Sequence, residues 1–404
     1  MDKHAAYIKN RLSLRSPQTA SLNILAEIAD TLSLKKDADL AVEQEKVLTY
    51  TGNLATTNGS ARVFTDFERN FPCVCFAVAT GVGKTRLMGA FIAWLNQAKG
   101  IKNFFVLAPN LTIYNKLIED FSNPRSPKYV FPGIGDFVHR PPGIITGDNY
   151  TNSKNLPLFD ESIRINVFNI SKINSETRGG KLPRIKRLSE YIGQSYFDHL
   201  AGLDDLVILM DESHHYRAER GMQVINELNP VLGIELTATP KTESGGTKLF
   251  KNVVYQYGLG TAMEDGFVKE PAVATRKDFD PSRYSQEELD RIKLEDGIRI
   301  HEDTKVGLEI YARDEKVRLV KPFVLVVTRD TDHASRVKAL IQSTAFFEGR
   351  YCNKVMEIHS NQRGEEKEEN IQQLLTLEDP SNKIEIVIHV NMLKVWGRTS
   401  TLPS

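Results

Sequence analysis

The sequence has few cysteines, no excess of charge and no long apolar run. Three cysteines in 404 residues are too few for the disulfide framework of a small secreted domain, and they fit a reducing cytoplasm. Its 52 basic residues balance 52 acidic ones, so net charge gives no overall attraction to nucleic acid and any such binding must be local. The chain has neither a leader with an apolar core nor the run of about 20 apolar residues that crosses a membrane. We therefore expect a cytoplasmic protein with no membrane partner.

The remaining composition is that of a folded protein with more than one domain. Apolar residues make up 41% of the chain and charged residues 26%, which are ordinary values for a globular protein and exclude wholesale disorder. A length of 404 residues leaves room for two domains and connecting elements.

Two of the cysteines, Cys73 and Cys75, lie in the short apolar run PCVCFAVAT. We expect them to be small apolar side chains on a buried strand. A metal-binding pair is the alternative, but the sequence offers no second Cys/His pair at ligand spacing.

From Cys73 onward, short apolar runs alternate with segments of helical spacing. The runs CVCFAVA, NFFVLAP, RINVFNI, DLVILMDE and GIELTATP are separated by helical patterns such as RLMGAFIAWL and IYNKLIEDF. This alternation indicates βαβ units on a parallel sheet whose strands are buried on both faces. Before it, Leu22–Leu32 has the spacing of an amphipathic helix, and we expect a short extended segment with Pro17 and Gln18 ahead of it.

After Pro271 the chain becomes charged, with both signs interspersed, and this favours a solvated helical connector over a binding tail. The apolar runs PFVLVVT and IEIVIHV then predict further strands, and ASRVKALIQ and EENIQQLLTL predict helices between them. We expect a second, smaller α/β unit here.

The strongest chemical signal is the segment ATGVGKT, at 79–85, between an apolar run and a helical pattern. Its Gly-Lys-Thr end matches a P-loop, in which backbone N–H groups surround phosphates, Lys84 reaches the β and γ oxygens, and the Thr85 hydroxyl binds Mg²⁺. The first glycine of the general pattern is replaced by Val78. A chance glycine-rich turn is the alternative, which the flanking strand and helix disfavour.

A second signal is DLVILMDESHH, in which an apolar strand delivers Asp211 and Glu212 at its carboxyl end. Ligands of parallel sheets bind at that edge. Asp211 is then placed to hold Mg²⁺, and Glu212 to orient or deprotonate the attacking water. A solvated strand end is the alternative for an isolated pair, but an upstream P-loop favours the catalytic interpretation.

A third signal, Thr237-Ala238-Thr239-Pro240, follows the apolar run GIEL. Its hydroxyl groups could hydrogen-bond the segment after Asp211 and report the state of the γ-phosphate. Taken alone, it is only a strand that leads into a turn.

In this order, ATGVGKT, DESH and TATP resemble motifs I, II and III of superfamily 2 helicases of the DExH type. The segments SPQ, LAPNLTIYNKLIEDF, VFNISKIN, AMEDGFVKEPAVATRKDF and IVIHVNMLK are similar to the restriction subunit of type III restriction enzymes and related helicases. The resemblance covers most of the chain, from Gln18 to Lys394. It implies an α/β fold of tandem RecA-like P-loop domains with parallel sheets, the first complete and the second partial.

The resemblance also implies domain limits and partners. It places an ATP-binding helicase domain at 1–272, with a helical, adenine-reading segment at 1–50. A charged connector at 273–321 and a partial second domain at 322–404, with a divergent tail at 395–404, would follow. ATP and Mg²⁺ would be the cofactors. Double-stranded DNA would be the partner, and a modification methyltransferase subunit is a further one that the family relation suggests.

Residue roles follow from the same resemblance. Gln18 would read the adenine edge, although an exposed polar residue at a helix start is the alternative. His214, Thr237 and Thr239 would couple hydrolysis to motion. Pro109 and Asn110, with Gly147 and Asp148, would touch the nucleic-acid backbone, which makes binding independent of sequence and sensitive to salt. The nucleotide contacts would be Gln18, Thr80, Gly81, Val82, Gly83, Lys84, Thr85 and Arg86.

The sequence departs from this family after Lys394. There the family has Glu-Gly-Trp-Asp and later an arginine-bearing motif VI, whereas this chain reads Val395-Trp396-Gly397-Arg398. Arginine fingers are worth about 10³–10⁵ in rate elsewhere, so we expect impaired catalysis and a truncated or frameshifted end. Arg398 is the alternative finger, but no surrounding pattern supports it. We also find no cluster that could form the family's nuclease.

Three functions therefore compete. The first is a DNA translocase or helicase motor of the type III restriction kind, and the intact P-loop and Asp-Glu pair favour it. The second is an inactive or regulatory ATP-binding module, which the missing arginine motif favours. The third is an RNA helicase, because the same motor parts would serve RNA equally well.

Overall fold

The computed structural model describes residues 2–58, 64–146, 149, 162–169, 196–217, 219–242, 248–359, 373–374 and 376–390. The chain divides into two compact units, Met1–Glu270 and Pro271–Ser404, which we describe separately. None of the helices in the described residues is both long and apolar enough to cross a membrane. The predicted tail at 395–404, with Arg398, lies outside the described residues, as do Gly147 and Asp148.

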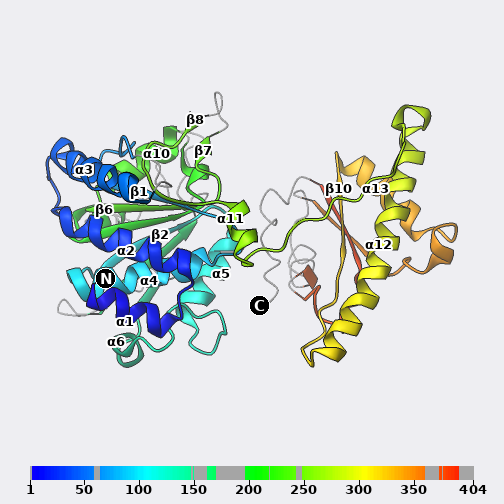
Figure 1. Cartoon of the computed structure of the whole chain (residues 1–404), viewed down its shortest axis with the longest axis horizontal. Coiled ribbons are helices and arrows are strands. Elements are labelled where there is room, and N and C mark those ends of the chain that lie inside the picture. The colour runs from blue at the N-terminus through cyan, green and yellow to red at the C-terminus, as the bar shows by residue number, and fades with distance from the viewer. Residues whose placement is uncertain are drawn as a thin grey trace. The chain divides into compact units, whose positions relative to one another are not determined.

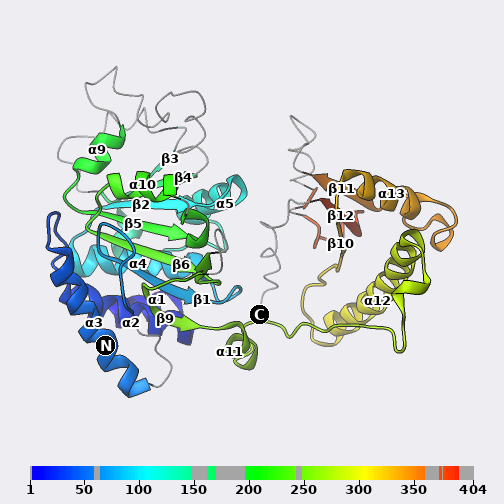
Figure 2. The same cartoon turned by 90° about the horizontal axis from the view of Figure 1, so that it is seen from above.

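The first unit is built on a seven-stranded sheet in the order β3-β4-β2-β5-β6-β1-β9, and every neighbouring pair in it is parallel. Figure 2 shows β2, β5 and β6 running side by side in one direction. The strands are β1 (Cys73–Val78), β2 (Asn103–Ala108), β3 (Gly143–Thr146), β4 (Arg164–Asn169), β5 (Leu206–Asp211), β6 (Leu232–Thr237) and β9 (Val253–Tyr257).

Helices cover both faces of this sheet. On one face α1 (Lys3–Leu12), α2 (Ser16–Thr31), α4 (Lys84–Lys99) and α5 (Leu111–Ser122) share a core with alternate residues of the central strands; α1, α2 and α4 lie together in Figure 1. On the other face, α9 (Tyr196–Gly202) and α10 (Glu219–Glu227) pack against the intervening residues. The unit also contains α3 (Leu40–Asn58), α6 (Gly135–His139), α11 (Leu259–Glu264), the 3-10 helix η3 (Ser213–Tyr216) and the hairpin strands β7 (Lys241–Thr242) and β8 (Lys248–Leu249).

The apolar runs of the sequence are the central strands. Every residue of β1, β5 and β6 is buried, as expected for strands covered on both faces. Cys73 and Cys75 lie within β1, fully buried, which confirms that they are core side chains.

The first helical prediction needs a correction at its start. Helix α2 begins at Ser16, with Pro17 in its first turn, so Pro17 and Gln18 are helical rather than extended. Proline suits this position because the first N–H groups of a helix have no partner within it.

The second unit has a three-stranded parallel sheet in the order β10-β12-β11. Its strands are β10 (Val324–Thr328), β11 (Val355–His359) and β12 (Ile386–Val390), and its longer helices are α12 (Gln286–Asp314) and α13 (Thr331–Gln342). Both helices contribute apolar side chains to one core on the same sheet face, with Leu294 and Ile298 coming from α12. The charged segment at 273–321 thus includes a long helix that packs on the second sheet. The predicted fold class, α/β with parallel sheets in tandem, is confirmed.

Candidate nucleotide-binding site

The P-loop joins β1 to α4 at the carboxyl edge of the first sheet. Gly81 and Gly83 have positive φ angles of 86° and 95°, which glycine adopts without strain. A Cβ atom on Gly83 would lie 2.7 Å from Gln18 Nε2, so a larger residue would displace the glutamine. The loop therefore has the tight backbone that phosphate binding at a helix N-terminus requires.

The Asp-Glu pair meets the P-loop lysine at this edge. Strand β5 ends at Asp211 and is separated from β1 only by β6. Lys84 Nζ lies 3.5 Å from Glu212 Oε1 and donates a hydrogen bond to Val78 O at 3.3 Å. Glu212 is buried and has a left-handed backbone, with φ of 54°, a conformation that a non-glycine residue keeps only where its surroundings hold it.

These residues fit a nucleotide with Mg²⁺. A buried carboxylate at the end of β5, the Thr85 hydroxyl in the first turn of α4 and the Lys84 ammonium offer the oxygen ligands and the cation that a metal-bound triphosphate needs. Thr85 and Asp211 would hold the ion, which when bound would neutralise phosphate charge.

A short hydrogen-bonded chain links motif II to motif III. His214 Nδ1 lies 3.0 Å from Thr237 Oγ1 and 3.6 Å from Glu212 Oε2. The Thr239 backbone N–H donates to Thr237 Oγ1 at 3.1 Å. Burial, helped by the charges of His215 and Lys84, lowers the pKa of His214 to about 4, so the imidazole is neutral near pH 7. The three residues assigned to coupling are thus in contact.

Residues at the start of α2 bind the P-loop through hydrogen bonds to its backbone. Gln18 Nε2 donates to Gly83 O at 2.9 Å, and Gln18 Oε1 accepts from the Arg15 backbone N–H at 2.9 Å. Arg15 Nη1 donates to Gly81 O at 2.9 Å, and its guanidinium lies over the Phe267 ring. Gln18 is buried, so the alternative of an exposed polar residue is wrong, while its reading of adenine stays a prediction.

The other predicted contacts are less tightly gathered. Arg86 Nη1 donates to Leu12 O at 2.9 Å, so its guanidinium is engaged with the end of α1. Pro109 and Asn110 follow β2 at the same sheet edge, where Asn110 Oδ1 caps α5 by accepting from the Ile113 N–H at 3.0 Å. Gly147 and Asp148 lie outside the described residues. The nucleotide role of Arg86 and the nucleic-acid roles of the others stay predictions.

A buried ionic network lies beside the site, and the sequence motifs do not reveal it. Glu235 is fully buried in β6 and is bonded by Arg69 and Arg217, while Arg217 also pairs with Glu68. One signal was present: a glutamate inside the apolar run GIELT must have a cationic partner, because an unpaired buried charge is too costly. The sequence does not show which arginines are the partners, because Arg217 is 18 residues and Arg69 is 166 residues away from Glu235.

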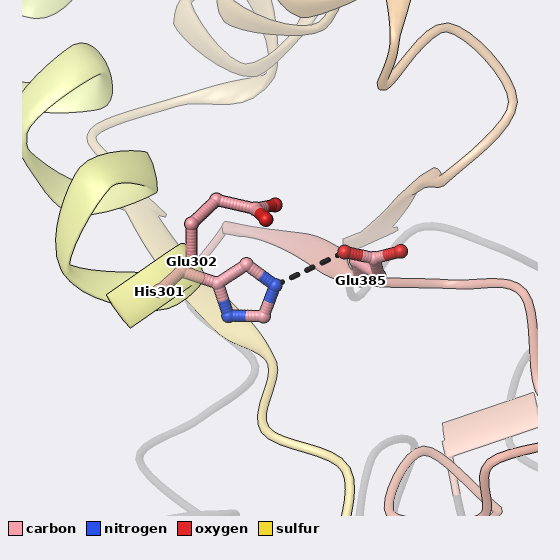
Figure 3. A group of neighbouring side chains, drawn as sticks. All are labelled: His301, Glu302 and Glu385. Carbon is pink, nitrogen blue, oxygen red and sulfur yellow. Dashed lines mark hydrogen bonds and ion pairs between the residues drawn. The ribbon is translucent and has the colours of Figure 1, made fainter. Parts of the chain in front are cut away.

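A second cluster of titratable side chains lies in the second unit. Among the described residues, His301, Glu302 and Glu385 are close enough to share a metal ion, and Figure 3 shows His301 directed toward Glu385. However, Glu385 already accepts from Lys354 Nζ at 2.6 Å, Lys305 Nζ at 3.1 Å and His301 Nε2 at 3.1 Å. Two ammonium groups would repel a cation, so the cluster fits an anchor between α12 and the sheet better than a metal site.

This anchor predicts a loss of stability in acid. Burial alone would raise the pKa of Glu385, but hydrogen bonds from Lys354, His301 and Lys305 outweigh it and lower the pKa from 4.5 to about 2. A carboxylate with a lowered folded-state pKa stabilises the fold above pH 4.5 and loses that contribution as the pH falls toward 2. Glu385→Gln should therefore lower the free energy of unfolding by roughly 2–3 kcal/mol at pH 7.

Thermal unfolding of the full chain checks this expectation at pH 7 and pH 3. The difference in unfolding temperature between wild type and Glu385→Gln should narrow in acid. Glu309→Gln, at an exposed position within α12, should match wild type at both pH values. A gap of equal size at both pH values would show that the ionised carboxylate is not what stabilises this unit.

The chain is similar in sequence to known proteins. A family model described as "Type III restriction enzyme, res subunit" matches residues 12–242, which is more than half of the chain. The probable type III restriction-modification enzyme HindVIP Res subunit of Haemophilus influenzae is 26% identical over 159 residues, covering 39% of this chain and 27% of that relative. The matched part of this chain therefore spans about a quarter of that relative's length.

Two solved structures give weaker likenesses. The ATP-dependent Type ISP restriction-modification enzyme LlaBIII bound to DNA shares 15% identity, with a TM-score of 0.46, and the match covers 89% of this chain and 25% of that one. Dbp5 of S. cerevisiae bound to RNA and ADP BeF3 shares 10% identity, with a TM-score of 0.39, and the match covers 95% of this chain and 76% of that one.

Proposed function

Because the chain belongs to the family of type III restriction enzyme res subunits, we propose that it is an ATP-dependent DNA translocase motor whose first unit hydrolyses ATP. The observation that carries the proposal is the meeting of Lys84, Asp211 and Glu212 at one sheet edge, with Lys84 Nζ 3.5 Å from Glu212 Oε1. Two motifs that are more than 120 residues apart in the sequence thus form one site.

Each residue of this site has a distinct role in the proposal. The Lys84 ammonium pairs with the β and γ phosphate oxygens, where a positive charge stabilises the negative charge of the transferred group. Glu212 takes the proton of the attacking water, because its carboxylate lies 3.5 Å from the lysine ammonium of the P-loop and can act as a base. Asp211 and Thr85 hold Mg²⁺.

The link between His214 and Thr237 is the proposed route from hydrolysis to motion. A neutral imidazole can either donate to or accept from a hydroxyl, so the bond at 3.0 Å can rearrange when charge changes at Glu212, 3.6 Å away. Thr237 in turn holds the Thr239 N–H at the start of the turn that leaves the sheet. A rearrangement of these hydrogen bonds would therefore move the segment after β6.

DNA is the nucleic acid along which we propose that the motor moves, and the family relation supports this choice. Pro109 and Asn110 lie at the same sheet edge as the nucleotide site, where backbone contacts would give salt-sensitive binding without sequence preference. A modification methyltransferase subunit is the proposed protein partner on the same ground. RNA binding and an inactive ATP-binding module are the competing outcomes.

Linkage between the two ligands tests this proposal without requiring a complete motor. We expect a non-hydrolysable ATP analogue to change the affinity of the chain for a 30-base-pair DNA duplex by about fivefold or more at low salt, and the duplex to change the affinity for the analogue by the same factor. Fluorescence anisotropy measures the first affinity and calorimetry the second.

Two controls separate the alternatives. Lys84→Ala should abolish the effect of the analogue on DNA affinity, and an RNA duplex of the same sequence should bind more weakly than DNA. Stronger and nucleotide-dependent binding of RNA would favour the RNA helicase. DNA affinity that is the same with and without the analogue would leave only the uncoupled ATP-binding module.

A further inference from the structure

The short helix η3, directly after the Asp-Glu pair, is held to β6 at two points. At the first, His214 contacts Thr237, as described above. At the second, Arg217, the residue that directly follows η3, donates from Nη2 to Glu235 Oε2. Glu235 and Thr237 are two residues apart on β6, so their side chains lie on the same face of the strand.

The spacing of these two contacts matches along both elements. Two residues of a strand advance by about 6.6 Å. From His214 in η3 to Arg217, the residue that caps the end of η3, a 3-10 helical rise advances by about 6 Å. Helix η3 therefore runs back along β6 with both side chains in register. A displacement of Arg217 would shift His214 away from Thr237 and would alter the left-handed turn at Glu212.

Arg217 is fixed far more firmly than a surface arginine. Besides Glu235, its guanidinium bonds Glu68 Oε2 at 2.6 Å and Asn252 Oδ1 at 3.1 Å, and it lies 3.7 Å from the centre of the Phe250 ring. The planar fork of arginine can satisfy several acceptors in one fixed geometry, which lysine cannot do. The network thus joins η3 to β6 and to the segment that precedes β9.

The Glu235 carboxylate is shared by a second arginine on its other side. Arg69 Nη2 and Nε donate to Glu235 Oε1 at 2.7 Å and 3.1 Å. Burial raises the pKa of Glu235, but the charges of Arg69 and Arg217 outweigh it and lower the pKa, which keeps the carboxylate ionised. Arg69 precedes β1, and its hydrogen bonds within the described part of the chain go to Glu235 and Met210, not to η3. The two arginines therefore differ in what they position.

We propose that Arg217 is a positioning residue for ATP hydrolysis, which by bonding Glu235 sets the register of η3 on β6 and so places Glu212 and His214. A buried ion pair contributes little net stability compared with a well-packed apolar pair, and its best-attested use is to select one arrangement among several. The inference rests on the proposed ATPase function of the same site.

A double-mutant cycle tests this role. Arg217→Lys should lower kcat for ATP hydrolysis by about tenfold or more, because small misplacements of catalytic groups are costly, while the dissociation constant for ATP should change less than about twofold. In a His214→Ala background, Arg217→Lys should lower kcat by a clearly smaller factor than in wild type, since one of the two groups that it positions is gone. Independent effects that multiply would overturn the proposal.

Arg69→Lys is the matched control, because it weakens the ion pairing of the same carboxylate. Arg69 bonds Glu235 Oε1, whereas Arg217 bonds Glu235 Oε2. It should lower the unfolding temperature about as much as Arg217→Lys, and its effect on kcat should multiply with that of His214→Ala. If the effects of Arg69→Lys and His214→Ala on kcat were coupled as strongly as those of Arg217→Lys and His214→Ala, general loosening of the core would explain the result. The register of η3 on β6 would then not be the cause.

Hydrogen exchange gives a readout that does not depend on ATP hydrolysis. In the nucleotide-free chain, backbone N–H groups from Glu212 to Arg217 should exchange faster in Arg217→Lys than in wild type or in Arg69→Lys. If wild type hydrolyses no ATP, the proposed function is wrong. The exchange measurement then still shows whether Arg217 holds η3 in its position on β6. Equal exchange in the two arginine variants would overturn the positioning role.

Discussion

Glu212→Gln should abolish ATP hydrolysis while leaving ATP affinity within about twofold of wild type. The amide keeps the shape of the side chain but cannot accept a proton from water, and general bases of this kind contribute about 10²–10⁴ in rate. Glu212 is buried at the end of β5 and faces the Lys84 ammonium at 3.5 Å, so no solvent buffer can replace it easily. Single-turnover phosphate release measures the rate, and calorimetry measures the affinity.

Two other carboxylate variants make this result specific. Asp211→Asn should instead raise the Mg²⁺ concentration needed for ATP binding, because it removes charge from the metal site. Glu45→Gln, at an exposed position of α3, should behave as wild type. If Glu212→Gln and Asp211→Asn gave the same Mg²⁺ titration, the division of roles between the two neighbours would be wrong.

Lys84→Ala should weaken ATP binding by roughly 10- to 150-fold. Charge-assisted hydrogen bonds are worth about 1.5–3 kcal/mol, and the substitution removes the lysine that P-loops direct to the β and γ oxygens. The loop itself should keep its shape, since Gln18 and Arg15 hold Gly83 and Gly81 through backbone carbonyl groups. Calorimetric titration with ATP and Mg²⁺ measures the change.

The same helix supplies the control for this variant. Lys99 lies at the other end of α4, where its ammonium pairs with Asp30 at 2.6 Å. Lys99→Ala should leave ATP binding at the wild-type value. Equal loss of affinity in both variants would mean that the helix, and not the charge at the P-loop, was disturbed, and unchanged affinity in Lys84→Ala would contradict the assignment of the site.

The parts of the fold that sequence predicted are those with strong local patterns. Strands β1, β5 and β6 are continuous apolar runs because they are covered on both faces, and α4 and α5 show helical spacing. The P-loop and the Asp-Glu pair were also predictable, because each is a contiguous motif at a strand end. Parallel strands bring such ends to one edge, so their meeting followed from the fold class.

The missed features have mixed patterns or depend on distant partners. Strand β11 carries Glu357 among apolar residues, and β9 carries Gln256, so neither reads as a buried run. The start of α2 was misplaced because Pro17 was interpreted as a break rather than as a first-turn residue. Pairing of Arg217 with Glu235 could not be foreseen, since only the folded sheet brings η3 alongside β6.

The central claim is that the P-loop and the Asp-Glu pair form one Mg²⁺-dependent ATPase site. Its most direct test is a single-turnover experiment in which the full chain, in excess over labelled ATP, is incubated with Mg²⁺ or with EDTA. We predict conversion of ATP to ADP and phosphate with Mg²⁺ and none with EDTA, because Asp211 and Thr85 would act through the metal ion. No conversion under either condition, or conversion at the same rate in EDTA, would contradict the account.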